Sequence, residues 1–88
     1  MPYLIVEYTF EQPLTDEQYA GAFNALKPCL EVRNIRRLRS WLSEDHKNAI
    51  CEYEAPDTQS LRDAYRAAQV GYAKVWSGKL FEFSAPKT

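Results

Sequence analysis

Residues 35–55 read IRRLRSWLSEDHKNAICEYEA, and this stretch decides the fold. The polar segment 44–47 lies between two runs, 35–43 and 48–55, in which side chains of different character alternate. Alternation with a period of two is typical of β-strands, and a short polar segment between two such runs indicates a hairpin. A four-residue turn would place Ser43 opposite Asn48, and the register of the whole hairpin follows from that pair.

The predicted register gives the two faces of the hairpin different characters. One face pairs opposite charges and, near the turn, two large apolar side chains: Arg37 with Glu54, Arg39 with Glu52, and Trp41 with Ile50. The other face pairs Leu38 with Tyr53 and Ser40 with Cys51. Since a slip of one residue would exchange the two faces, a register that satisfies both at once is well specified.

The flanking segments predict two further strands and two helices. Residues 2–10 form a strand, because they are rich in aromatic and β-branched residues. A helix over 16–32 begins at a capping box made by Thr15 and Gln18, and Pro28 is expected to kink it. A second helix begins after Asp57 and ends at Gly71. Residues 74–83 form the last strand, in which Gly78 marks a bulge or a close approach.

The order of these elements is β-α-β-β-α-β, which predicts an α+β fold of the ferredoxin-like type. Such a fold has a four-stranded antiparallel sheet with two helices on one face. Residues 1–88 are expected to form a single domain, since domains usually contain about 100–200 residues. The helix-free face of the sheet is the informative surface, because an apolar open face in so small a chain is expected to pack on a second copy.

The composition narrows the class of function. The chain has 11 Lys and Arg against 12 Asp and Glu, and this balance argues against a general nucleic-acid binder. Two cysteines are too few for a disulfide-stapled secreted domain. The longest uninterrupted apolar stretch, residues 3–6, is far shorter than the roughly 20 residues of a membrane span. We therefore expect a cytoplasmic protein that does not enter the membrane.

A polar cluster on the open face is the main candidate ligand-binding site. The usual strand order places the first strand beside the third, which brings Glu7 next to the hairpin. The candidate site then contains Glu7, Arg37, Arg39, Glu52 and Glu54, bordered by Tyr3 and Trp41. Two interpretations stay open: cross-strand ion pairs that contribute little, or a polar cleft for a metal or a small anion that a dimer encloses.

Metal donors are scarce in the sequence. The single histidine, His46, lies in the hairpin turn beside Glu44 and Asp45. These three side chains are either solvated or a weak surface metal site that a neighbouring chain completes. Cys29 and Cys51 lack the CxxC spacing and are expected to pack as small core residues. No glycine-rich phosphate loop is present, and the acidic third strand disfavours RNA on the sheet.

The hairpin and the start of the second helix carry a resemblance to a known family. The segments SWLSED at 40–45 and ICEYEAPD at 50–57, with VEY at 6–8, resemble a bacterial family of domains of unknown function that includes a nickel-binding protein. The resemblance implies a ferredoxin-like domain that dimerises through its sheet, similar to the dimeric α/β barrels, and binds a divalent metal such as nickel. Arg39 departs from the pattern, in which a histidine is often found at this position. A guanidinium cannot ligate a metal, but it can bind a carboxylate or phosphate bidentately.

Three functional hypotheses follow. The first is a homodimeric ligand- or metal-binding domain without catalysis. The second is a small cofactor-free enzyme, similar to monooxygenases or isomerases of the dimeric-barrel type, with Glu7 or Glu52 as general base. The third is a structural interaction module in which the polar cluster only sets the register of the dimer.

Overall fold

The element order predicted from the sequence is confirmed by a computed structural model that describes residues 3–83. Three strands and a helix come first, in the order β1 (Tyr3–Thr9), α1 (Asp16–Glu31), β2 (Arg36–Leu42) and β3 (Asn48–Glu54). They are followed by α2 (Thr58–Ala68) and β4 (Lys74–Gly78). Within the described residues, no helix is long and apolar enough to cross a membrane.

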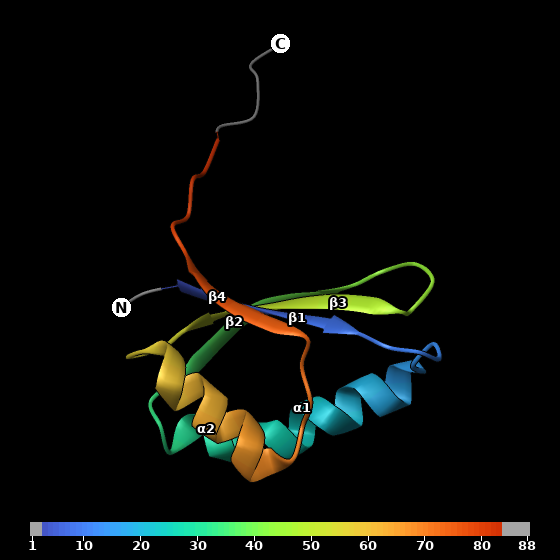
Figure 1. Ribbon diagram of the computed structural model, residues 1–88, viewed down its shortest axis with the longest axis horizontal. Helices are drawn as coiled ribbons and strands as arrows, with labels where there is room; N and C mark the ends of the chain where they lie inside the picture. Colours follow the sequence, from blue (N-terminus) through green and yellow to red (C-terminus); the bar gives the residue numbers. More distant parts are fainter. Residues whose placement is uncertain (1–2, 84–88) are drawn as a thin grey trace.

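The four strands form one antiparallel sheet in the order β2-β3-β1-β4, with both helices on the same face (Figure 1). This is the ferredoxin-like arrangement that the alternating patterns predict. The second face of the sheet carries no helix and is called the open face below. β1 lies in the middle of the sheet between β3 and β4, so Glu7 and Glu52 belong to neighbouring strands, as expected.

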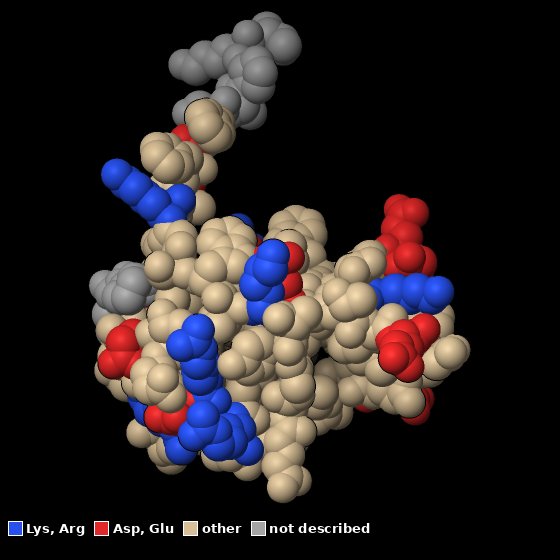
Figure 2. Space-filling model, in the orientation of Figure 1, with Lys and Arg blue, Asp and Glu red and all other residues tan. Residues whose placement is uncertain are grey.

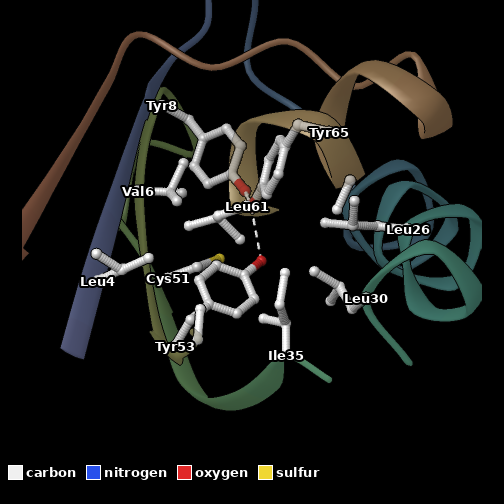
Figure 3. Close-up of a cluster of buried hydrophobic side chains, with 13 residues drawn as sticks. Leu4, Val6, Tyr8, Leu26, Leu30, Ile35, Cys51, Tyr53, Leu61 and Tyr65 are labelled. Carbon is white, nitrogen blue, oxygen red and sulfur yellow. Dashed lines mark hydrogen bonds between the residues drawn. The ribbon is translucent and has the colours of Figure 1, made fainter. Parts of the chain in front are cut away.

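The core lies between the sheet and the helices. Alternate residues of β1 and β3 point into it, namely Leu4, Val6, Tyr8, Ala49, Cys51 and Tyr53. Leu26 and Leu30 of α1, and Leu61, Ala64 and Tyr65 of α2, close it from the other side (Figure 3). The core contains three tyrosines whose hydroxyls meet: Tyr65 bonds to both Tyr8 and Tyr53, the second bond being 2.6 Å long.

Capping residues near each helix terminus determine where the two helices begin and end. Thr15 and Gln18 form the predicted capping box, and α1 continues through Pro28 to Glu31. Asp57 caps α2 by accepting a hydrogen bond from the Ser60 amide. The prediction that Gly71 ends α2 was wrong, because Gln69 is the C-cap residue and adopts the left-handed conformation at φ 58°.

The hairpin register is confirmed near the turn and wrong at its far end. Trp41 pairs with Ile50 and Arg39 with Glu52, as predicted. Beyond Arg39 the register shifts at a bulge, so Arg36 pairs with Glu54 and Arg37 with Tyr53. The extra residue, Leu38, exchanges the faces of the two arginines that precede it.

The last strand is shorter than predicted. β4 ends at Gly78, opposite Tyr3, and not at Phe83. β1 begins at Tyr3, so its described part provides no partner for residues 79–83. These five residues lie outside the sheet and rise from it on the side away from the helices (Figure 1).

Candidate functional site

The centre of the candidate site is Glu52 on β3. Its Oε2 atom lies 2.9 Å from Nε of Arg39 and accepts a hydrogen bond of 3.3 Å from the indole Nε1 of Trp41. Arg39 and Trp41 both belong to β2 and flank Glu52 because the register near the turn is regular. The Glu52 side chain is only 17% exposed, whereas Trp41 is 64% exposed. The sequence-predicted ion pair therefore exists, and an indole orients its carboxylate.

Glu7 on β1 is held in the same way by a residue that the sequence analysis missed. The indole Nε1 of Trp76 on β4 donates a 2.6 Å hydrogen bond to Oε2 of Glu7. Trp76 pairs with Ile5, and Lys74, two residues before it, pairs with Glu7, so Trp76 and Glu7 are diagonal neighbours on the same face of the sheet. The signal that could have found it was the alternation of the last strand, which places Trp76 on the face that also carries Glu7.

Glu54 and Arg37 are not brought together. Glu54 accepts a hydrogen bond from Nη2 of Arg36 at 2.8 Å instead. Arg37 faces the helices, where its guanidinium lies over the Phe23 ring, 4.2 Å from the ring centroid. The placement of Arg37 on the open face was therefore wrong, and the bulge at Leu38 is the cause.

A shallow hollow of about 100 Å³ lies on the open face beside Glu52. Tyr3, Ile5 and Trp76 form much of its wall, together with Glu52, Gly78, Lys79 and Leu80. Gly78 is a close-approach point, as the sequence predicts: a Cβ at this position would lie 3.1 Å from Cζ3 of Trp76. The hollow thus combines aromatic walls with one carboxylate and one ammonium group.

Two of the three turn residues that the sequence offered as a metal site, Asp45 and His46, have other partners. Asp45 accepts hydrogen bonds from Oγ of Ser43 and from the Lys47 amide, and these bonds lower the pKa of the Asp45 carboxyl. Nδ1 of His46 lies 2.6 Å from the carbonyl oxygen of Leu14. Glu44 is exposed.

Across residues 3–83 no three His, Cys, Asp or Glu side chains gather in a group that could hold a metal ion. The donors that the described part of one chain offers therefore do not fit a nickel site, since a bound transition metal needs several converging ligands.

The cysteines behave as expected for core residues. Cys51 is fully buried and Cys29 is half-buried, and both thiols are free. Burial raises the pKa of the Cys51 thiol, so this group is protonated at neutral pH. A buried, protonated thiol is not a nucleophile or a metal ligand, which removes Cys51 from the candidate chemistry.

On the face of the molecule that Figure 2 shows, the charged side chains do not form one extended surface of a single sign. In Figure 2 the charged side chains of the visible face form small groups, several of them containing both signs, separated by uncharged surface. This pattern agrees with the formal net charge of −1 and with pairing between neighbours.

Comparison with known proteins identifies the family. A family profile described as "Nickel responsive protein SCO4226-like" matches residues 3–77. The chain belongs to the SCO4226-like family. No curated protein matches the chain.

A solved structure of a member supports the fold. The crystal structure of SCO4226 from Streptomyces coelicolor A3(2) superposes with a TM-score of 0.81 at 14% sequence identity, covering 91% of this chain and 99% of that one. At so low an identity the likeness concerns the fold. The family resemblance that the hairpin motifs carried is confirmed by the profile match over residues 3–77.

Proposed function

We propose that this SCO4226-like chain is a homodimeric binding domain whose open face holds a divalent cation or a small polar ligand between two copies. The observation that carries the proposal is the pair of carboxylates, Glu7 and Glu52, that indole N–H groups fix on an otherwise uncovered sheet face. A carboxylate that is already oriented loses little entropy when it binds a ligand, so such groups are suited to recognition.

The apolar surface around these carboxylates supports a dimer. Trp41, Ile50 and Trp76 are 64%, 39% and 45% exposed, and all three belong to strands of the sheet. A monomer rarely leaves several large apolar side chains on one face uncovered, and a two-fold interface buries the same patch on both copies. We infer that the open face is this interface.

The dimer would also supply donors that one chain lacks. The hydrogen bonds to Glu7 and Glu52 all fall on Oε2, so Oε1 of each group remains a possible ligand atom. Packing two open faces together brings up to four such carboxylates toward one axis. Carboxylate oxygens are ligands for divalent cations, and the family description supports including nickel among them.

The experiment is a thermal-shift screen of the purified chain against Ni²⁺, Mg²⁺, Ca²⁺ and Mn²⁺, and against phosphate and citrate. A ligand present at about 100 times its dissociation constant stabilises the folded state by about 2.7 kcal/mol, which raises the melting temperature by several degrees. We expect the shift for at least one probe, and we expect Glu52→Gln to abolish it.

The matched control is Glu44→Gln, which makes the same chemical change in the exposed turn. We expect this variant to keep the shift. If Glu44→Gln abolishes the shift and Glu52→Gln does not, the turn is the site and the open face is not. If no probe changes the melting temperature, the binding function is overturned.

A further inference from the structure

A segment next to the open face has a strand-like sequence, but no strand among residues 3–83 pairs with it. Residues 79–83, KLFEF, follow β4 directly and are called the arm below. Phe81 and Phe83 are 68% and 88% exposed, more than the large apolar residues of the sheet itself. Exposure of two neighbouring aromatic side chains is costly in water, and it marks an interaction surface.

The arm is connected to the open face at its base. Leu80 and Lys79 line the hollow beside Glu52 and Trp76. The arm rises from the sheet on the side opposite the helices (Figure 1). A second copy that packs on the open face would occupy the space into which the arm projects.

The apolar residues that could receive the arm lie at the other end of the same sheet. Gly78 pairs with Tyr3, whereas Trp41 pairs with Ile50, which in turn pairs with Glu7. Tyr3 and Glu7 are four residues apart on β1, or about 13 Å along the strand. The arm points away from the turn between β2 and β3 (Figure 1), near which Trp41 pairs with Ile50, so it would have to reverse direction to cover these residues of its own chain.

The arm can reach these residues on a second copy if the two open faces pack together around a two-fold axis. This axis lies between the two sheets and is perpendicular to their strands. It places the arm end of one sheet over the hairpin end of the other, and five extended residues span about 17 Å. We propose that the arm of each copy crosses onto the second copy and packs Phe81 and Phe83 against its exposed Trp41 and Ile50. This inference rests on the proposed sheet-to-sheet dimer and adds the segment that secures it.

The direct test places a photoreactive p-benzoylphenylalanine at Phe81 in the full chain. Equal amounts of ¹⁴N- and ¹⁵N-labelled protein are mixed, allowed to exchange, irradiated and digested with trypsin. We expect crosslinks of mixed isotope composition to the peptides 40–47 and 48–62, which contain Trp41 and Ile50. Crosslinks of a single isotope composition mean that the arm folds onto its own chain, and this result overturns the proposal, as does the absence of crosslinks to either peptide.

A second measurement separates the arm from the dimer. The double variant Phe81→Ser/Phe83→Ser removes the apolar rings from residues that are exposed in the single chain, so the fold is expected to survive. Sedimentation equilibrium should show a dimer at least about tenfold weaker, since each buried Phe contributes on the order of a tenfold change or more. The control is Val32→Ser, a change at an apolar residue that is 78% exposed at the end of α1, for which no change is expected.

The outcomes distinguish the two proposals. If Trp41→Ser weakens the dimer and the arm variant does not, the sheet-to-sheet dimer stands and the arm proposal falls. If the unmodified chain sediments as a monomer at all concentrations, both the arm proposal and the dimer on which it rests are overturned.

Discussion

The hydroxyl of Tyr65 joins two other buried tyrosines, and its removal should be costly. Tyr65 is 1% exposed and bonds to Tyr8 and to Tyr53. Tyr65→Phe leaves both phenols without this partner in the core, for which we expect a loss of about 1–3 kcal/mol in the free energy of unfolding, measured by urea denaturation. Tyr72→Phe is the control, because it removes the same hydroxyl from a tyrosine that is 37% exposed. Equal losses in the two variants would contradict a structural role for the network.

The same tyrosines predict how stability depends on pH. Burial raises the pKa of Tyr53 to about 12 from the ordinary value of 10.0, and it raises the pKa of Tyr8 and Tyr65 as well. The folded state therefore holds these protons more tightly than the unfolded state. The contribution of Tyr53 to stability is complete below pH 10 and is lost as the pH rises toward its folded-state pKa of about 12; the raised pKa values of Tyr8 and Tyr65 act in the same direction.

The urea midpoint measured from about pH 8 to about pH 11.5 tests this dependence. We expect a plateau followed by a fall above about pH 10. Tyr72→Phe should keep the fall, and Tyr65→Phe should make it smaller because one buried phenol is gone. A midpoint that stays level to the end of the range would exclude the raised pKa values as a factor in stability.

At the scale of the elements, the alternation of side chains along the strands predicted the strand register near the turn but not the bulge in β2. Trp41 opposite Ile50 and Arg39 opposite Glu52 followed from turn length and pattern alone. The bulge at Leu38 did not, because two adjacent arginines, Arg36 and Arg37, give no indication of which one faces the helices. The choice of face for Arg37 depends on its contact with Phe23 of α1, which only the packed fold brings near.

Replacing the glycines of α1 and β4 by alanine should change the free energy of unfolding in opposite directions. Gly21 lies inside α1, and a Cβ there would have no atom within 4 Å, whereas a Cβ at Gly78 would meet the Trp76 ring at 3.1 Å. Gly21→Ala should raise the free energy of unfolding by about 0.5–1 kcal/mol, because alanine loses less backbone entropy in a helix. Gly78→Ala should lower it and shift the Trp76 fluorescence. A loss of stability in Gly21→Ala would contradict the open surroundings of this residue.

At the scale of the whole molecule, the candidate site was only half predictable because it joins distant strands. Glu52 and Arg39 are close in the hairpin, so the sequence revealed their pair. Glu7 and Trp76 are 69 residues apart, and their hydrogen bond depends on β4 pairing with β1. Strand pairing thus places the exposed row of Trp41, Ile50 and Trp76 beside the two carboxylates, and this row connects the site to the proposed dimer.

Charge reversal tests whether this row is an interface. Arg39 neighbours Trp41 and neutralises Glu52, so Arg39→Glu would place two adjacent carboxylates on the open face of each copy. Uncompensated like charges buried between two copies are strongly unfavourable, and we expect sedimentation equilibrium to show a monomer with an unchanged circular dichroism spectrum. Arg66→Glu is the control: it also breaks a pair between an arginine and a carboxylate, that with Asp63, but Arg66 is 76% exposed and lies on α2, on the opposite side of the sheet from the open face. If both reversals leave the dimer intact, its contact surface lies elsewhere than the open face. If only Arg39→Glu dissociates it, the polar cluster is part of the interface, and the ligand screen then decides whether it also binds a ligand or only sets the register of the two copies.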